Sequence, residues 1–347
     1  MIYYVILFLI IFLNSCIKNK KTYCWVVGTI LVLFAGLRAN TIGPDTSQYE
    51  YIFNEIQRFG IHSLGFFFLE EDQESEPGYL LFQYMMGLVG DYNLFKFLCV
   101  IIQTVPAIYL IYRYSTNKCI SLLTYFCLPI YTMMSMSMMR QGIAFGVFLM
   151  AFHFIIERKF KFYLLAIAIG FLFHSSVIVT LPLYFLYNLP YKRKYNIMII
   201  GVIVSSYIFS SVLFAFLAGF SRMQYEAGDV GGVKMLIFLL ALLGGSFFVK
   251  EQTLKVPFLK FQLYLLVFTI VCWNIGMNLA AVFRLAVYTE FFLCLYIPNL
   301  LGKIQNKNIS QLAVFVSCVV CIMIMQLVVM RELEFYSYHP YYFLWEK

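Results

Sequence analysis

Long apolar stretches separated by short charged breaks run from one end of this chain to the other. A helix needs about 20 apolar residues to cross the hydrocarbon core of a bilayer. Hydrophobic residues fill 62% of the 347 positions and charged residues only 12%, whereas soluble domains are roughly half apolar and a quarter charged. The pattern therefore predicts an all-α polytopic membrane protein that forms a single integral membrane domain over 1–347.

About 12 transmembrane helices are expected from the lengths of the apolar stretches. They fall at 2–17, 22–37, 94–112, 119–135, 140–156, 162–174, 175–189, 196–217, 233–249, 258–276, 282–300 and 310–330. Residues 162–189 have an alternative reading as one long span. A division at His174-Ser175-Ser176 is preferred, because it keeps the basic residues that follow on the basic side of the membrane.

Lysine and arginine residues indicate which side each loop faces, because short cytoplasmic loops carry an excess of them. Six alternate loops contain 16 of the 25 cationic residues, namely Lys18, Lys20, Lys21, Arg113, Lys118, Arg158, Lys159, Lys161, Lys192, Arg193, Lys194, Lys250, Lys255, Lys260, Lys303 and Lys307. The opposite side holds 14 of the 17 acidic residues. The basic side is therefore predicted to be cytoplasmic and both termini to face outward. The net charge of +8 then reflects topology, and no nucleic-acid partner is expected.

Residues 38–93 form a long outward loop between spans 2 and 3, and a loop of that length is expected to contain helices. Gly43-Pro44-Asp45 predicts one helix start, with Tyr49, Ile52, Phe53 and Ile56 forming an apolar face that can lie on the membrane surface. Glu76-Pro77-Gly78 predicts a second start. Between them lies an acidic run, Glu70–Glu76, which is either a solvated face or a divalent-metal site.

A few charged residues lie within or at the outward mouths of apolar spans, where an unpaired charge is costly and indicates function. They are Arg38, Arg140, Arg284 and Glu290, and His174 lies at the outward turn of the divided helix pair. Simpler readings are headgroup anchoring for Arg38 and Arg140, an ion pair of Arg284 with Glu290, and a structural role for His174. Because arginine presents a planar fork of donors to phosphates, the outward arginines together suggest a lipid-phosphate or lipid-diphosphate substrate.

At these residues the sequence resembles the EpsG-like family of bacterial exopolysaccharide polymerases, which have a Wzy-type role. The segments that carry the resemblance are Arg38 with Ile42–Tyr49, Glu76–Tyr79, Arg140–Ala144, Phe173–Ser176, Leu181–Tyr184, Arg284–Tyr288 and Tyr338–Tyr342. The resemblance implies an enzyme of the bacterial inner membrane that transfers a growing glycan from undecaprenyl diphosphate onto another carrier-linked repeat unit at the outer leaflet. It also implies a fold related to the GT-C glycosyltransferases.

This reaction assigns roles to the outward polar residues. Arg140 and Arg284, and after them Arg38, are predicted to bind the donor diphosphate, because fixed cations stabilise the charge that develops on a leaving group. His174, Asp45 and Glu76 are alternative bases for the acceptor hydroxyl. Tyr49, Gln141, Tyr288 and Glu290 are supporting residues. No metal and no other cofactor is expected. The expected partners are the undecaprenyl-diphosphate-linked oligosaccharide, membrane lipid and a chain-length regulator protein.

Other functions remain open for the same pattern. A flippase or transporter of the same lipid would also use outward arginines, but it would need a second polar set facing the cytoplasm. A metal-dependent GT-C transferase with a polyprenyl-phosphate sugar donor would use Glu70-Glu71-Asp72, and an O-acyltransferase would use His174. Single repeat units left on the outward-facing carrier lipid would distinguish loss of a polymerase from loss of a flippase.

Overall fold

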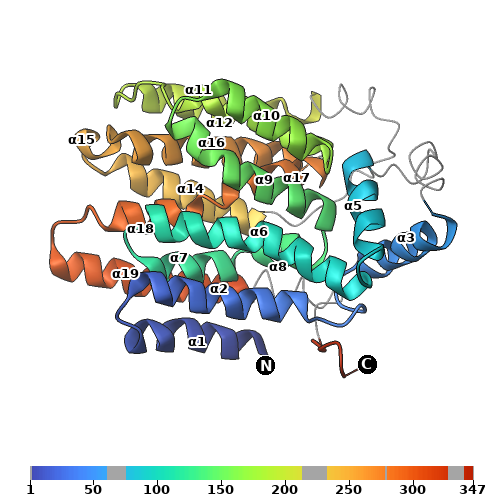
Figure 1. Cartoon of the computed structure of the whole chain (residues 1–347). Coiled ribbons are helices and arrows are strands. Elements are labelled where there is room, and N and C mark those ends of the chain that lie inside the picture. Colours follow the sequence, from blue (N-terminus) through green and yellow to red (C-terminus); the bar gives the residue numbers. More distant parts are fainter. Residues whose placement is uncertain (1, 61–75, 213–232, 278–279, 327–339, 347) are drawn as a thin grey trace. The chain divides into compact units, whose positions relative to one another are not determined.

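The computed structural model of the chain describes residues 2–60, 76–212, 233–277, 280–326 and 340–346. These residues form helices and no β-strand, apart from a single isolated bridge between Arg38 and Phe343 (Figure 1). The all-α prediction is therefore confirmed for the described part of the chain. The helices group into two compact units, 1–181 with 311–347, and 182–310.

The first unit contains the N-terminal half of the chain and its C-terminal segment. Its helices are α1 (Ile2–Cys16), α2 (Lys20–Gly36), α3 (Thr46–Phe59), α5 (Pro77–Gly87), α6 (Tyr92–Tyr114), α7 (Lys118–Cys127), α8 (Pro129–Met136), α9 (Met139–Ile156), α10 (Phe160–Phe171), the 3₁₀ helix η1 (Ser175–Thr180) and most of α19 (Lys307–Ile324). The second unit contains α11 (Leu183–Leu186), α12 (Tyr195–Ile208), α14 (Val233–Phe247), α15 (Glu251–Leu254), α16 (Pro257–Gly276), α17 (Ala280–Glu290) and α18 (Leu293–Leu301).

Among the described residues, three helices are long and apolar enough to cross a membrane, α6, α9 and α16. The pair α7 and α8, bent by 62° at Pro129, would make a fourth. The other predicted spans coincide with shorter or broken helices, such as α17 and α18 within 282–300. The count of 12 spans and the GT-C relationship therefore stay predictions. The helix breaks within 162–189, because α10 ends at Phe171 and η1 begins after His174, and the division of this stretch into two spans stays a prediction.

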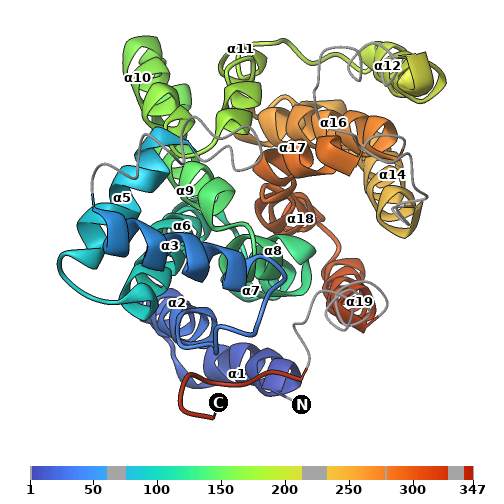
Figure 2. The same cartoon turned by 90° about the vertical axis from the view of Figure 1, so that its right-hand side faces the viewer.

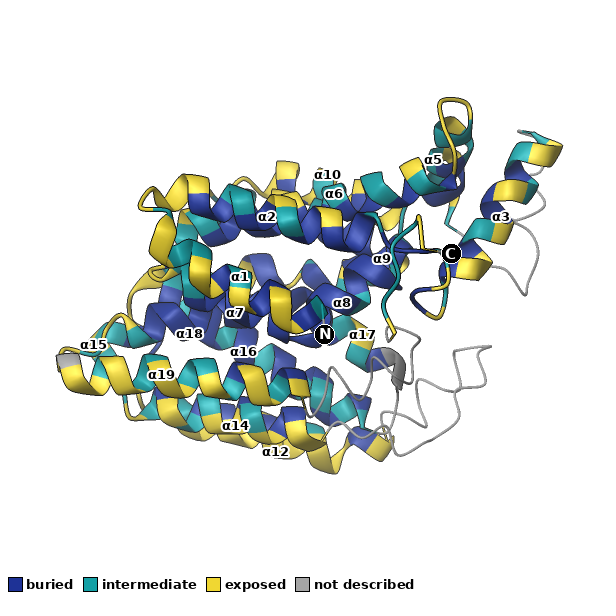
Figure 3. Cartoon of the chain, turned by 90° about the horizontal axis from the view of Figure 1, so that it is seen from below, coloured by how far each residue is buried: buried dark blue, intermediate teal, exposed yellow. Residues whose placement is uncertain are grey.

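The apolar surfaces of these helices suit a bilayer. In α1 the buried residues Tyr3, Ile6, Leu7 and Ile10 recur at helical spacing, whereas Phe8 and Phe12 on the other side are exposed. Figure 3 shows buried and exposed residues alternating along α1, whereas α19 is mostly exposed or intermediate. An exposed face built from large apolar side chains is costly in water and favourable in lipid.

Three helix pairs shape the first unit. Helix α6 packs against α2 and α9, and α9 also packs against α10. Glycines allow the α6–α9 approach, because a Cβ at Gly146 would lie 2.3 Å from the Ile102 carbonyl oxygen and a Cβ at Gly142 would lie 2.3 Å from Gln103 Oε1. Such small residues let helix backbones come together in the membrane.

Residues 38–93 contain two helices, and the side of the membrane on which they lie stays a prediction. Helix α5 begins at Pro77, and α3 begins at Thr46, two residues after Pro44. In Figures 1 and 2 both helices lie at the N-terminal end of α6. The predicted apolar face of α3 is confirmed, but Tyr49, Ile52, Phe53 and Ile56 are buried against protein, including α5 and α6, instead of lying on the membrane surface. The acidic residues 70–75 lie outside the described part of the chain.

Candidate functional site

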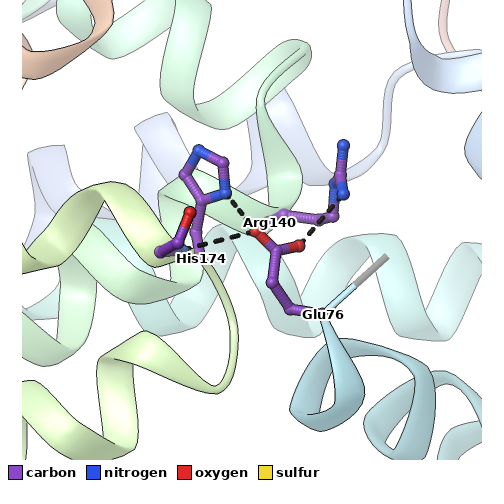
Figure 4. Close-up of polar contacts among 4 residues, drawn as sticks. Glu76, Arg140 and His174 are labelled. Carbon is purple, nitrogen blue, oxygen red and sulfur yellow. Dashed lines mark hydrogen bonds and ion pairs between the residues drawn. The ribbon is translucent and has the colours of Figure 1, made fainter. Parts of the chain in front are cut away.

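Three of the predicted site residues meet at one carboxylate in the first unit (Figure 4). Glu76 Oε1 lies 2.5 Å from His174 Nδ1, and Glu76 Oε2 accepts a hydrogen bond of 3.0 Å from Arg140 Nη1. The backbone N–H of Ser175 adds a longer contact of 3.4 Å to Glu76 Oε1. The three side chains remain partly accessible, with exposed fractions of 16% for Glu76, 27% for Arg140 and 20% for His174. Charge therefore holds the cluster together, and each of its side chains keeps some exposed surface.

Glu76 is positioned by the start of α5. It occupies the N-cap of that helix, with Pro77 next in the chain, but its side chain makes no capping hydrogen bond and reaches out to His174 and Arg140 instead. The Gly78 N–H donates to the Leu172 carbonyl oxygen at 2.9 Å, and a Cβ at Gly78 would lie 2.7 Å from that oxygen. Only glycine fits this contact without a shift, so Gly78 docks the start of α5 against the segment that leads into His174.

His174 is positioned by the break after α10. Its backbone N–H donates to Gly170 at 3.0 Å and closes that helix, and its extended backbone then leads into η1. The imidazole therefore projects from a turn held at both ends. If Nδ1 carries the proton that Glu76 accepts, Nε2 is left as the proton acceptor of the ring.

Arg140 lies in the first turn of α9, directly after Met139. A cation at a helix N-terminus is disfavoured by the helix dipole, which favours anions there. Arg140 therefore does not stabilise α9 as a helix, and the Glu76 carboxylate offsets its charge. The N-terminus of α9 and the guanidinium together form a positively polarised position suited to a phosphate.

The charges also set the protonation of the carboxylate, which lies outside the spanning helices. Burial raises the pKa of Glu76, but the hydrogen bond with His174 and the charge of Arg140 outweigh it, and the net pKa lies below the ordinary value of a glutamate. Glu76 is therefore ionised at neutral pH. It therefore orients its partners as an anion.

Asp45 belongs to Gly43-Pro44-Asp45, the first of the two predicted helix starts within 38–93. It occupies the N-cap position of α3 without making a capping hydrogen bond, and its Oδ2 accepts from Ser137 Oγ at 3.0 Å. Ser137 belongs to the turn between α8 and α9, three residues before Arg140. Asp45 thus holds the loop against this turn, a contact between positions 92 apart in sequence that the sequence analysis did not anticipate.

Arg38 is placed differently from Arg140. Its side chain is fully buried, Nη1 donates to the Ala35 carbonyl at 2.7 Å, and Nε donates to the Ile42 carbonyl at 3.4 Å. The fully buried Lys96 donates to the Arg38 carbonyl at 2.6 Å and also binds the Asn40 side chain. Sequence reasoning missed Lys96, although a lysine three residues inside an apolar stretch was the signal that could have found it.

The remaining predicted residues divide between the units. In the second unit, α17 carries Arg284, which is exposed, and the buried Tyr288 and Glu290. Glu290 Oε2 accepts from Trp273 Nε1 at 3.3 Å. In the first unit Gln141 and Tyr49 are both buried, and Tyr49 belongs to the apolar cluster beside Met139. The predicted roles of all these residues stay predictions.

Across the described residues, no group of three or more histidine, cysteine, aspartate or glutamate side chains is arranged to hold a metal ion. Glu70, Glu71 and Asp72, which carried the alternative metal reading, lie outside that part of the chain.

The described part of this protein is helical and rich in apolar residues, and Glu76, Arg140 and His174 form its charged cluster. These two features define the class of protein to which it belongs. The family model for the EpsG family matches residues 21–343, nearly the whole chain, and the protein belongs to that family. Membership supports a polysaccharide polymerase, a glycosyltransferase-type enzyme. No curated protein and no solved structure matches the chain.

Proposed function

We propose that this protein polymerises polysaccharide repeat units by transferring a glycan from undecaprenyl diphosphate onto a second carrier-linked repeat unit at the outer leaflet. The observation that carries the proposal is the Glu76 carboxylate, which contacts a potential base, His174, and a potential diphosphate ligand, Arg140. Family membership supplies the reaction class, and the charge distribution of the loops supplies the side of the membrane.

In this mechanism His174 is the base. Glu76 accepts the Nδ1–H and fixes the tautomer, so that Nε2 takes the proton from the acceptor hydroxyl as its oxygen attacks the anomeric carbon of the donor sugar. The bond between that carbon and the diphosphate oxygen breaks, and the electron pair leaves with the carrier diphosphate. The ionised state of Glu76 also stabilises the imidazolium that forms.

Arg140 and the N-terminus of α9 receive the leaving diphosphate. Their positive charge matches the charge that grows on the leaving oxygen in the transition state, and this difference between ground state and transition state is what accelerates the reaction. Asp45 accepts a hydrogen bond from Ser137 and so holds the turn that precedes α9, the helix that carries Arg140. Arg284 is a second candidate ligand in the other unit, and Arg38 is assigned to the support of the loop.

The test uses a bacterial strain whose surface polysaccharide depends on this gene. His174→Gln is expected to lower polymer formation by about 10²–10⁴-fold, the range for loss of a general base, and to leave single repeat units on outward-facing carrier lipid. His153→Gln, in the last turn of α9, is the matched control and should polymerise normally. Normal polymer length in His174→Gln at equal membrane abundance would reject His174 as the base.

The same assay separates the alternatives. Repeat units accumulating on the cytoplasmic leaflet would instead indicate a flippase. Loss of activity of the purified protein on chelation, with recovery on adding magnesium, would indicate a metal-dependent transferase and would direct attention to Glu70, Glu71 and Asp72.

A further inference from the structure

The turn between α8 and α9 lies directly before Arg140 and consists only of Ser137 and Met138. The Met139 N–H donates to the Ser137 carbonyl oxygen at 2.8 Å. The Gly142 N–H donates to the Met138 carbonyl oxygen at 2.7 Å, which begins the hydrogen bonding of α9. The turn is therefore bonded directly to the first residues of that helix, and a shift of the turn would also move the base of the Arg140 side chain.

Thr46, the first residue of α3, contacts the end of α8. Its side chain is fully buried, and its Oγ1 lies 2.7 Å from the Ile42 carbonyl oxygen and 3.2 Å from the Met136 carbonyl oxygen. A threonine hydroxyl has one hydrogen to donate, so the two carbonyls share it. Gly43 lies against the same Met136 oxygen, which a Cβ at that glycine would approach to 2.0 Å. The last residue of α8 is thus held closely against the start of α3.

Tyr92, the first residue of α6, in turn holds Thr46. Its side chain is buried, and its hydroxyl donates to the Thr46 carbonyl oxygen at 2.9 Å. Tyr79 belongs to the same apolar cluster as Tyr92, but its hydroxyl has no hydrogen-bond partner among the described residues. Two consecutive hydrogen bonds therefore connect α6 to α3 and α3 to the residue that precedes the turn before Arg140.

We infer that Thr46 is a positioning residue that places Arg140 at the donor diphosphate, and that it acts through the Met136 carbonyl and the turn that follows. This inference rests on the proposed function. A guanidinium recognises a diphosphate well only when its donors meet the phosphate oxygens in a fixed geometry. Asp45 binds the side chain of Ser137, whereas Thr46 binds the backbone at the neighbouring residue, so the start of α3 holds the turn at two adjacent points.

The experiment measures the Kd of farnesyl diphosphate, a short prenyl diphosphate, for the folded fraction of the purified full-length protein in detergent micelles. Thr46→Val removes the hydroxyl and keeps a branched side chain, and it is expected to weaken binding about 10-fold, the effect of one lost hydrogen bond to a buried group. Thr46→Ser keeps the hydroxyl and should bind as the wild type does. Tyr92→Phe should weaken binding by a smaller factor, whereas Tyr79→Phe, the matched control in the same cluster, should have no effect.

A double-mutant cycle identifies the residue through which Thr46 acts. In an Arg140→Lys background, Thr46→Val should cause no further loss, because the planar fork that it positions is absent. A purely structural role would lower the folded fraction and leave the Kd of folded molecules unchanged.

The inference is overturned if folded wild type and Thr46→Val bind equally, or if the loss is undiminished in Arg140→Lys. If Thr46→Val does not fold, Tyr92→Phe decides in the same way, by comparison with Tyr79→Phe. If the wild type binds no prenyl diphosphate at all, the proposed function fails instead.

Discussion

Two arginines of the outward side were predicted for the same task, and the structure surrounds them differently. Arg38, in the connection between α2 and α3, is fully buried and donates to backbone carbonyls. Arg140, at the start of α9, is partly exposed and is paired with a carboxylate. Carbonyl partners belong to the local fold and stay in place when a substrate binds, whereas Arg140 donates to the side-chain carboxylate of Glu76.

The segments around the two arginines also differ. The connection between α2 and α3 that carries Arg38 is bonded to Lys96 of α6 and to the C-terminal segment. The Leu344 N–H donates to the Leu37 carbonyl, and the Ala39 N–H donates to the Tyr342 carbonyl. The Arg140 region is assembled from helix ends and carries a histidine. The surroundings of Arg38 therefore favour a structural role, and those of Arg140 favour a role in binding.

The largest effect is expected from Arg140→Lys. Lysine keeps the charge but loses the planar fork, so polymer formation should fall by at least about 100-fold while the protein remains inserted in the membrane. Arg58→Lys, at an arginine of α3 whose side chain is 73% exposed, should have no effect. The readout is polymer length on gels, normalised to protein abundance in membranes. Near-normal polymer in Arg140→Lys would remove the proposed distinction between the two arginines.

Glycine substitutions should reveal how tightly the Arg38 connection is packed. Gly43 has a φ of 94°, and a Cβ there would lie 2.0 Å from the Met136 carbonyl oxygen. Gly60 at the end of α3 has a φ of 71°, but no atom of the described residues lies within 4 Å of a Cβ placed there. Gly43→Ala should lower the free energy of unfolding by about 3 kcal/mol or more, through strain and a clash together, and Gly60→Ala by about 1 kcal/mol through strain alone.

Denaturation with sodium dodecyl sulfate in mixed micelles, followed by tryptophan fluorescence, measures both glycine variants. Equal losses would mean that backbone strain dominates and that the contact with Met136 is relaxed in the membrane.

Arg38→Lys is expected to lower stability and to leave activity nearly unchanged, whereas Arg140→Lys is expected to lower activity. Loss of the donors to the Ala35 and Ile42 carbonyls should lower the free energy of unfolding by about 2 kcal/mol, because buried acceptors lose their partners. The activity of each folded molecule should change little. A polymerisation defect in Arg38→Lys at unchanged stability would return Arg38 to the substrate site, as the sequence analysis first placed it.

Much of this arrangement follows from hydropathy and helix signals. The break at His174, the start of α5 at Glu76-Pro77 and the apolar face of α3 were all predictable, because each depends on neighbouring residues. Sorting charges by side predicted a common outward location for Glu76, Arg140 and His174. Their contacts join positions 64 and 98 apart in the chain, and no local pattern specifies which residues meet over such separations.

The predictions that differed from the structure share one physical cause. Hydropathy reports that a side chain avoids water, but it does not say whether lipid or protein covers it. The face of α3 therefore packs against protein where the membrane surface was expected. Arg38 donates to carbonyls inside the fold, and its predicted role at the substrate stays a prediction. Lys96 was overlooked because its charge was counted with the outward side instead of being matched with a buried partner.

The smallest effect concerns pH and tests whether the charge of Glu76 stabilises its pairing with Arg140 and His174. The pKa of Glu76 is lower in the folded protein than in the unfolded chain, where it is about 4.3. The pairing of Glu76 with Arg140 and His174 therefore stabilises the folded protein at pH values above about 4.3. This stabilisation is lost as the pH falls through the folded-state pKa. Glu76→Gln should be less stable than the wild type by about 1 kcal/mol at pH 7, and the difference should shrink steadily as the pH is lowered below about 4.3. Thermal unfolding of both proteins in micelles across this range measures the difference. A gap that stays constant with pH would mean that Glu76 stabilises the site by packing and that its charge is not what holds Arg140 and His174 together.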